Sequence, residues 1–263
     1  MLTGEHHYEH RHRRIVHEKK HRQFIAVIVD HTNRRVLDVL ASREKAHVAD
    51  YLRQKRQEGL LAEVVEVTCD MWDAYANAAK EVFGENCRVV IDRFHVMMNF
   101  QEQLTNARGE IQRRLRPEDS KVLKGTRWLW LKNEENLTAQ VQQERDGLKE
   151  RFPELKQLAE QRENLRAIFE DRTIMSVEEG RKQLMAWMAE AVKLGLKGLA
   201  TFCKTLSNWM DQIAGYFVSR SSNGRTPGFN HGLRSILWRA FGMTNFRRFR
   251  LRVLDRFGRP AND

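Results

Sequence analysis

The sequence predicts an α/β protein whose mixed sheet is interrupted by a long helical segment. Two observations support this fold class. Short β-rich runs alternate with helical patterns over the first part of the chain, and charged and apolar residues then recur at helical spacing over residues 96–217. An antiparallel pair followed by strand–helix–strand alternation is typical of an α/β sheet with at least one parallel crossover.

The first predicted strands form a hairpin. Residues 24–30 and 35–40 are β-rich runs, and turn-forming residues at 31–34 join them. Apolar residues at three- and four-residue spacing then predict a helix over residues 42–57. Ser42 is expected to cap this helix, because its hydroxyl can accept from a backbone N–H of the first turn.

Two further predicted strands each end in an aspartate. Residues 64–69 lead to Asp70 and residues 88–91 lead to Asp92, with a helix between them that Gly84 closes. Ligands gather at the carboxyl ends of strands in open α/β sheets, so both aspartates are candidate ligands of a hard divalent cation. Two such ions about 3.5–4 Å apart would serve phosphoryl transfer. Strand-end aspartates also begin helices and turns, and spacing alone leaves that alternative open.

The rest of the chain is predicted to be helical. We expect a single apolar helix face formed by Leu199, Phe202, Leu206, Met210, Ile213 and Phe217. Two helices follow, and the last carries Phe246, Phe249, Val253 and Phe257 on one side. The expected organisation is a basic arm (1–23), a first part of the core (24–97), a helical insertion (98–217) and C-terminal helices that complete the core (218–260).

Excess positive charge lies at the two ends of the chain, which has a formal net charge of +11. Residues 219–260 contain ten Arg, no Lys and one Asp, and residues 1–23 contain six basic and three acidic residues. A chain of this kind usually meets a polyanion, and the planar guanidinium group suits phosphate. A solvated helix face is the alternative interpretation of the arginine-rich end.

Several classes of protein are excluded or disfavoured. No apolar stretch approaches 18 residues, so no membrane span is expected. The chain begins without a signal-peptide core, and Cys69, Cys87 and Cys203 lie far apart, which together predict a cytoplasmic protein without a zinc ribbon. Six His among the first 21 residues are mixed with Arg and lack a ligand period, which favours a basic arm over a metal site.

Several ordered segments, read together, resemble bacterial insertion-sequence transposases of the ISL-three type. They are VTCDMWDAY (67–75), VIDRFHV (90–96), LKNEENLT (131–138), Tyr216-Phe217, Ser222-Asn223-Gly224, Gly228-Phe229-Asn230 and Arg239-Ala240-Phe241-Gly242. The resemblance runs from about residue 24 to the end. It implies a ribonuclease-H-like fold with a helical insertion, and an Asp-Asp-Glu triad that binds two Mg²⁺ or Mn²⁺ ions for DNA strand cleavage and transfer.

The resemblance also implies roles for individual residues and partners. Asp70 matches the second triad aspartate, and Asp92 and His95 match the motif beside the site. His95 alone could equally be a packed histidine at a helix start. The implied partner is transposon terminal-repeat DNA, with a homo-oligomer or pairing with an intact transposase, in a nucleoid-associated setting. Candidate DNA-binding residues are Arg220, Asn223, Arg225, Asn230, Arg234, Arg239, Arg247, Arg248 and Arg250.

Two of the three triad positions depart from the family pattern. The position of the family's Glu is occupied by Pro227, and no Asp-Glu pair stands on the strand expected before Phe24. His17-Glu18 is the nearest pair, and a gapless reading puts Arg14 at that place. The zinc-binding and helix-turn-helix segments usual in the family also have no match, so we expect a truncated chain with weak or absent cleavage activity.

Two alternatives to a degenerate transposase remain. The chain could be a non-catalytic DNA-binding protein that modulates an intact transposase by pairing with it or occupying its DNA. It could also be a general nucleic-acid binder without ties to transposition, which would bind unrelated DNA equally well with a steep salt dependence.

Overall fold

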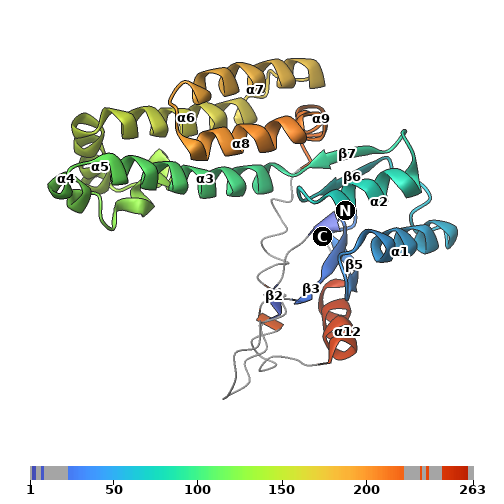
Figure 1. Cartoon of the computed structure of the whole chain (residues 1–263). Coiled ribbons are helices and arrows are strands. Elements are labelled where there is room, and N and C mark those ends of the chain that lie inside the picture. Colours follow the sequence, from blue (N-terminus) through green and yellow to red (C-terminus); the bar gives the residue numbers. More distant parts are fainter. Residues whose placement is uncertain are drawn as a thin grey trace. The chain divides into compact units, whose positions relative to one another are not determined.

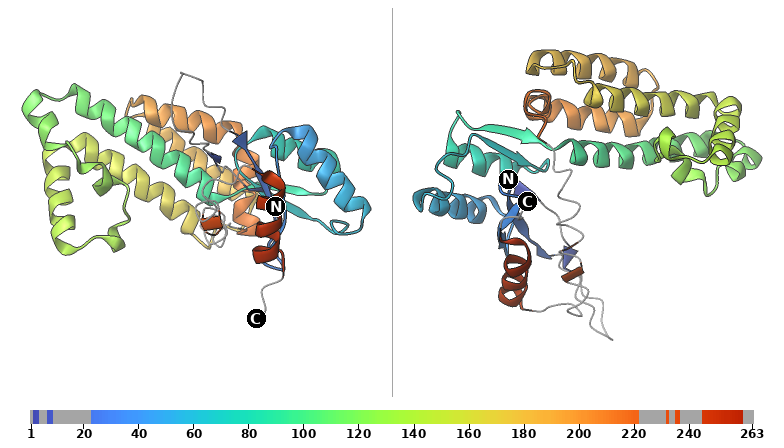
Figure 2. Two further views of the ribbon diagram at one scale, coloured as in Figure 1. Left: turned by 90° about the horizontal axis from the view of Figure 1, so that it is seen from below. Right: turned by 180° about the vertical axis from the view of Figure 1, so that it is seen from behind.

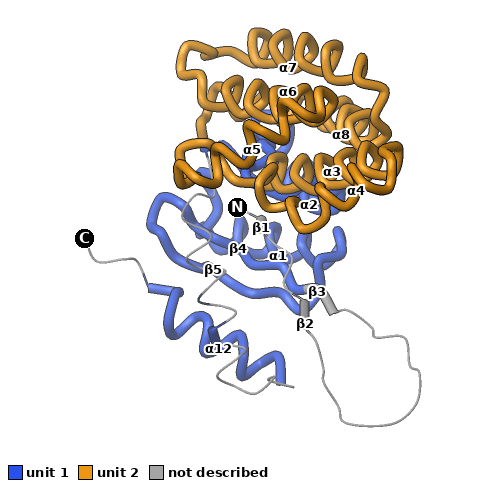
Figure 3. Tube along the Cα trace, turned by 90° about the vertical axis from the view of Figure 1, so that its left-hand side faces the viewer, with its two compact units in different colours: residues 1–94, 221–263 blue, residues 95–220 orange. Residues whose placement is uncertain are grey.

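The protein forms two compact units, which are drawn in different colours in Figure 3. The computed structural model describes residues 2–3, 7–8, 23–221, 232, 235–236 and 245–259. The first unit, here called the sheet unit, comprises residues 1–94 and 221–263, and the second, the helical unit, comprises residues 95–220. The chain therefore leaves the sheet unit once and returns to it.

The sheet unit contains a five-stranded mixed sheet of order β5-β4-β1-β6-β7. The strands are β1 (Leu2–Thr3), β4 (Ala26–Asp30), β5 (Arg35–Leu40), β6 (Glu66–Cys69) and β7 (Arg88–Ile91). β4 is antiparallel to both β5 and β1, whereas β6 is parallel to both β1 and β7. The predicted hairpin and parallel crossover are confirmed, and the protein is a mixed α/β protein.

The central strand is one that the sequence patterns did not predict. β1 consists of two residues, and Leu2 lies opposite Ile28 of β4 on one side and Cys69 of β6 on the other. A second short ladder joins β2 (His7–Tyr8) to β3 (Gln23–Phe24). A two-residue strand is too short to show the alternation from which strands are recognised, so these residues gave no signal.

The β4–β5 turn follows from its side chains. Asp30 accepts hydrogen bonds from the backbone N–H of Asn33 at 3.0 Å and from its side-chain amide at 2.7 Å. Arg34 adopts a left-handed backbone conformation with φ of 53°. Partial burial raises the pKa of Asp30, but these hydrogen bonds and the nearby Arg35 together hold that pKa below its usual value. Aspartate is a common residue at the first position of a β-turn.

Two helices, α1 (Lys45–Gln57) and α2 (Asp73–Phe83), pack against each other beside the sheet. The predicted cap of the first was wrong: α1 begins at Lys45, and the Ser42 hydroxyl accepts from the N–H of Glu44 ahead of the helix. The predicted end of the second is confirmed, because Gly84 follows α2 with φ of 77°, a conformation that favours glycine.

The last helix, α12 (Phe246–Phe257), packs on the β4–β5 hairpin (Figure 1). Phe249 and Val253 are buried in a cluster with Val27, Val36 and Val39. Asn245 caps the helix by accepting from the N–H of Arg248. This helix was predicted. Of the predicted helix before it, only 232 and 235–236 belong to the described residues.

The helical unit contains no strand over residues 95–220, all of which are described. Its helices are α3 (Arg93–Arg114), α4 (Pro117–Val122), η1 (Thr126–Trp130), η2 (Glu134–Asn136), α5 (Ala139–Arg151), α6 (Pro153–Glu170), α7 (Val177–Val192), α8 (Lys197–Asn208), α9 (Met210–Ala214) and α10 (Tyr216–Ser219). Helices α6, α7 and α8 pack in series (Figure 2). Phe100, Trp187 and Phe202 form an aromatic cluster with ring centroids 4.7 to 5.7 Å apart.

The single helix predicted over residues 199–217 was wrong. The backbone breaks at Trp209 and turns again at Gly215, which gives the three helices α8, α9 and α10. The apolar residues nevertheless stay on the buried side of each piece. The spacing of apolar residues predicts which side of a helix is buried, and this spacing continues across both breaks. No Gly-Pro or Asn-Gly pair marks either break in the sequence.

Candidate active site and nucleic-acid interface

Two aspartates follow neighbouring parallel strands. Cys69 of β6 lies opposite Ile91 of β7, so Asp70 and Asp92 leave the sheet at the same edge. The N–H of Asp92 donates to the carbonyl of Cys69 at 3.2 Å and extends the ladder by one bond. Asp70 is 7% exposed and Asp92 is 0% exposed. The sequence therefore located a buried pair of strand-end carboxyl groups.

The two aspartates differ in local role. Asp92 begins α3, because its Oδ1 accepts from the N–H of Phe94 at 3.0 Å. The helix-start alternative thus holds for Asp92. Asp70 is followed by a tight turn in which the N–H of Trp72 donates to the Asp70 carbonyl at 2.7 Å, and α2 starts at Asp73.

The edge that holds Asp70 is also where β1 ends. β1 and β6 are parallel with Leu2 opposite Cys69, so both strands finish at the same side of the sheet. In the sequence, β1 is followed by Gly4 and Glu5, which lie outside the described residues. β1, the strand beside β6, therefore lies well before His17-Glu18 in the sequence. The His17-Glu18 pair was the nearest match to the family's first aspartate.

Carboxylate oxygens are suitable ligands for Mg²⁺ or Mn²⁺, and Asp70 and Asp92 are the carboxylates that directly follow the parallel strands β6 and β7. Within the described ranges no three His, Cys, Asp or Glu side chains gather closely enough to hold a metal ion. His95 is half-buried on the first turn of α3. The remaining motif residues Asn223, Arg225, Pro227, Asn230, Arg234 and Arg239 lie outside the described residues.

The thiol of Cys69, next to Asp70, is expected to be unreactive. Cys69 is 0% exposed, and burial, reinforced by the neighbouring Asp70 carboxylate, raises the pKa of its thiol. A thiol with a raised pKa stays protonated at neutral pH, and only the thiolate is a good nucleophile or metal ligand. Cys69 therefore serves as a buried packing residue of β6.

The motif at residues 131–138 is bound by arginines of α5 and α6. Arg162 is 3% exposed and donates to the carbonyl of Leu131 at 2.8 Å and to Asn133 Oδ1 at 2.5 Å. The two acidic residues that follow Asn133 are paired as well, by the ion pairs Glu134–Arg145 and Glu135–Arg166. The hydrogen bonds from Arg166 lower the pKa of Glu135. This motif holds the helical unit together, a role its sequence did not reveal.

Arg220, a predicted DNA contact, is engaged within the helical unit. Its guanidinium group donates to the carbonyls of Phe169 at 3.1 Å, Asp171 at 2.6 Å and Ile174 at 2.5 Å. The same group lies over the ring of Phe217, 5.2 Å from its centroid. Three carbonyl acceptors use most of its donors, which gives Arg220 a structural function where the α6–α7 connection meets the end of α10.

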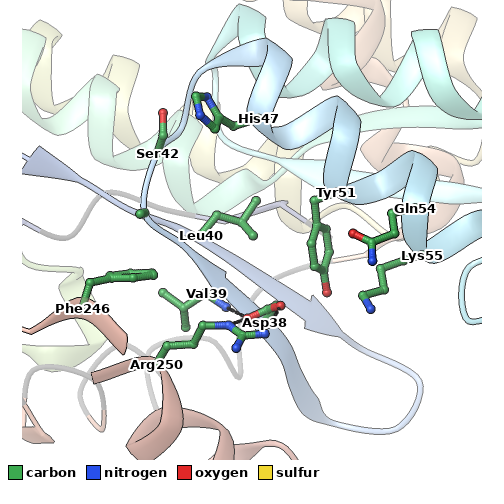
Figure 4. A pocket seen from close by; sticks show the side chains of 11 residues that line it. Asp38, Val39, Leu40, Ser42, His47, Tyr51, Gln54, Lys55, Phe246 and Arg250 are labelled. Atoms are coloured by element: carbon green, nitrogen blue, oxygen red, sulfur yellow. Dashed lines mark hydrogen bonds and ion pairs between the residues drawn. The ribbon is translucent and has the colours of Figure 1, made fainter. Parts of the chain in front are cut away.

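Arg250, another predicted DNA contact, faces the sheet. It forms a two-pronged ion pair with Asp38 of β5, Nε to Oδ1 at 2.5 Å and Nη2 to Oδ2 at 2.7 Å (Figure 4). Asp38 also accepts from the N–H of Val39 at 2.7 Å. The pair borders a cavity of about 420 Å³ that is lined on its other side by Tyr51 and Lys55 of α1. Side-chain hydrogen bonding to Asp38 raises the pKa of Arg250, which keeps the guanidinium charged.

Arg247 and Arg248 of the same helix are exposed. Of the three predicted DNA contacts on this helix, two thus face solvent and one is turned toward the sheet. At 3.6 residues per turn, Arg248 lies about 160° around the helix axis from Arg250, whereas Arg247 lies about 60° from it.

Comparison with known proteins gives an independent assignment. The family model of ISL-three type (ISL3) DDE transposases, described as "Transposase", matches residues 14–253. The chain is 25% identical over 248 residues to the transposase for insertion sequence element IS1001 of Bordetella parapertussis. That alignment covers 93% of this chain and 59% of the relative, so the chain spans less than two thirds of that protein's length.

No solved structure matches this chain. None of the helices in the described ranges is long and apolar enough to cross a membrane. The family match covers nearly the whole chain, and it includes both strand-end aspartates and most of α12. The protein therefore belongs to the ISL-three type of DDE transposases.

Proposed function

We propose that this protein has a ribonuclease-H-like core that binds transposon-end DNA, with weak or absent strand cleavage. The observation that supports the core assignment most is the position of Asp70, at the edge where the parallel strands β1 and β6 both end. An antiparallel hairpin on one side of β1 and two parallel strands on the other make up this mixed sheet. Carboxyl ends of strands are the usual place for catalytic groups.

Asp70 is the proposed principal ligand of a hard divalent cation, Mg²⁺ or Mn²⁺, and Asp92 its neighbour at the same edge. When bound, such an ion polarises a phosphate oxygen and activates a water molecule. Oδ1 of Asp92 also accepts from the N–H of Phe94, which fixes this carboxylate at the start of α3. The buried position of both groups would exclude bulk water and strengthen their attraction for a cation.

The impairment is proposed from the two remaining triad places. Pro227 has no carboxylate, so it cannot replace a metal-binding Glu. Glu5 is the first acidic residue after β1 in the sequence, and we propose it as the nearest substitute for the missing first aspartate. Its longer side chain and the loss at position 227 would leave fewer well-placed oxygens than two ions require.

The test is cleavage of terminal-repeat DNA in Mn²⁺, compared between the natural protein and Asp70→Ala. We expect the two to give equal, background nicking while the natural protein still binds the DNA. Strong cleavage that disappears in Asp70→Ala would overturn the impairment. Failure to bind terminal-repeat DNA at all would overturn the assigned function.

A second candidate function is a non-catalytic DNA-binding protein that modulates an intact transposase. It is favoured by the combination of Pro227 with the exposed arginines of α12. The test is co-purification with a full-length transposase of the same type, followed by its cleavage assay with and without this protein. Specific pairing that lowers cleavage supports this function, and the absence of both pairing and inhibition removes it.

A further inference from the structure

The solvent-facing side of α12 carries only one acidic residue among many arginines. Its inner side is marked by the buried residues Phe249 and Val253 and by the half-buried Phe246, Arg250, Leu254 and Phe257. The outer side carries the exposed Arg247, Arg248, Arg252 and Arg256, here called the arginine face together with Arg259 just beyond the helix, and the exposed Leu251. Asp255 is the single carboxylate on it.

The guanidinium groups of the arginine face are not neutralised from within the described parts of the chain. None of the five forms an ion pair with a described carboxylate, and Arg256 lies over the ring of its neighbour Phe257. Two exposed arginines of the helical unit differ in this respect. Arg151 pairs with Asp119 and Arg181 pairs with Asp211, both at 2.5 Å, although their side chains are 52% and 46% exposed.

The orientation of the arginine face is fixed by the inner side of the helix. Phe249 and Val253 are each 0% exposed against the β4–β5 hairpin, and Arg250 is held by Asp38. The inner anchor therefore prevents the helix from rotating its charged side inward. Arg248, Arg252 and Arg256 recur every four residues, which places them about 6 Å apart along the axis.

We propose that the arginine face docks on the backbone phosphates of duplex DNA, independently of sequence. The choice of DNA among polyanions rests on the proposed function. A row of unpaired guanidinium groups on one rigid helix matches a row of phosphates, each of which an arginine can bind with two parallel hydrogen bonds. Arg250 is excluded from this surface, because two of its N–H groups bind Asp38, whose carboxylate neutralises its charge.

Salt dependence makes the proposal quantitative. Each phosphate neutralised in B-DNA contributes about 0.9 to the slope of log affinity against log salt. The double variant Arg248→Gln/Arg252→Gln should therefore lower the slope by about 1.8 and weaken binding at least about tenfold near 0.1 M salt. The probe is a fluorescently labelled duplex of random sequence, and binding is followed by fluorescence anisotropy of the full chain.

The matched control is Arg151→Gln/Arg181→Gln, which removes the same charge from exposed arginines that already have carboxylate partners. We expect this control to keep the affinity and slope of the natural protein. Circular dichroism melting of both double variants checks that each is folded, since all four side chains lie on the surface.

Three outcomes would overturn the proposal. Equal losses in the two double variants would mean that net charge alone governs binding. An unchanged slope in the α12 variant would place the contact elsewhere. Binding to vesicles that contain phosphatidylserine, without binding to the duplex, would assign the surface to a lipid. Because the readout is binding, DNA docking without any cleavage supports this inference even where the catalytic proposal fails.

Discussion

Arg250 and Asp38 are 212 positions apart in the sequence and meet through both oxygens of one carboxylate. The carboxylate is nearly buried, with a side chain 6% exposed, whereas the arginine side chain is 39% exposed. This contact attaches the last helix to the edge strand of the sheet. It also shows that arginines of one short helix have different surroundings, since Arg247 and Arg248 are exposed.

Replacement of Arg250 should destabilise the protein more than replacement of its exposed neighbours. Arg250→Gln leaves Asp38 without its cationic partner, and we expect a loss of about 2 kcal/mol in the free energy of unfolding, less than for a fully buried pair because the arginine is partly solvated. Urea denaturation followed by circular dichroism measures it. Arg247→Gln is the control and should change stability by less than about 0.5 kcal/mol; equal effects would deny the pair a structural role.

A methyl group at position 198 should disturb the contact between α8 and α3. A Cβ there would lie 2.4 Å from the carbonyl oxygen of Gln103 and 2.9 Å from the backbone nitrogen of Ala107. Backbone atoms cannot move aside cheaply, so Gly198→Ala should cost about 1–3 kcal/mol. Gly147→Ala in α5 meets nothing within 4 Å and should stabilise by about 0.5–1 kcal/mol. Thermal melts of both variants give the comparison, and a stabilised Gly198→Ala would contradict the close approach.

The buried arginine that binds the 131–138 motif should be needed for stability and dispensable for DNA binding. Arg162→Met removes the donors to Leu131 and Asn133 and leaves these half-buried acceptors without them, at a cost of about 1–3 kcal/mol. Arg151→Met, in an exposed pair, should cost at most about 1 kcal/mol. Urea unfolding and anisotropy, measured below the transition, separate the two properties. A loss of DNA affinity in folded Arg162→Met would show that the motif serves the interface.

The three thiols should be unreactive in the native protein. Burial raises the pKa of Cys69, Cys87 and Cys203, so each is protonated and shielded at neutral pH. A chromogenic disulfide reagent at pH 7 should detect no fast-reacting thiol until urea exposes all three. Burial of the three protonated thiols contributes to stability below a pH of about 9, the pKa of a cysteine in the unfolded chain. As the pH rises above that value, the unfolded state loses protons that the folded state keeps, and this contribution is lost. A fast-reacting thiol in the native state would disprove the burial.

Restoring a carboxylate at position 227 should increase cleavage if that residue limits it. We expect Pro227→Glu to produce Mn²⁺-dependent nicking of terminal-repeat DNA that the natural chain lacks, and Pro227→Gln to remain at background. The gain should vanish when Asp70→Asn is added, because an amide is a weaker ligand than a carboxylate. Activity that survives the loss of Asp70 would point to a different site.

The parts of the structure that were predictable are those with long patterns. The hairpin of residues 24–40 and the strands that lead to Asp70 and Asp92 have enough alternating or β-branched residues to be recognised. The strand at residues 2–3 could not be recognised, because its role depends on partners far along the chain. Local patterns report burial, and they do not report which distant segment completes a sheet.

The roles of the arginines illustrate the same limit at the candidate site. Composition correctly drew attention to an arginine-rich end, but it grouped Arg220 and Arg250 with the solvent-facing residues. Arg220 binds carbonyls of the α6–α7 connection and Arg250 binds Asp38, and neither acceptor is near in sequence. A helical wheel would have placed Arg250 beside Phe249 and Val253, whereas nothing in the sequence indicates the three carbonyls around Arg220.

The two-residue strand β1 connects the two halves of the sheet. The hairpin β4–β5 and the parallel pair β6–β7 are not hydrogen-bonded to each other. They are connected within the sheet through β1, which lies between β4 and β6. Leu2 and Thr3 thus join the two halves of the sheet, and removing them would separate these halves and open two new strand edges, one on β4 and one on β6. Engineers who add a tag or trim this protein should work at the other terminus, because a few residues here decide whether the two halves become one surface.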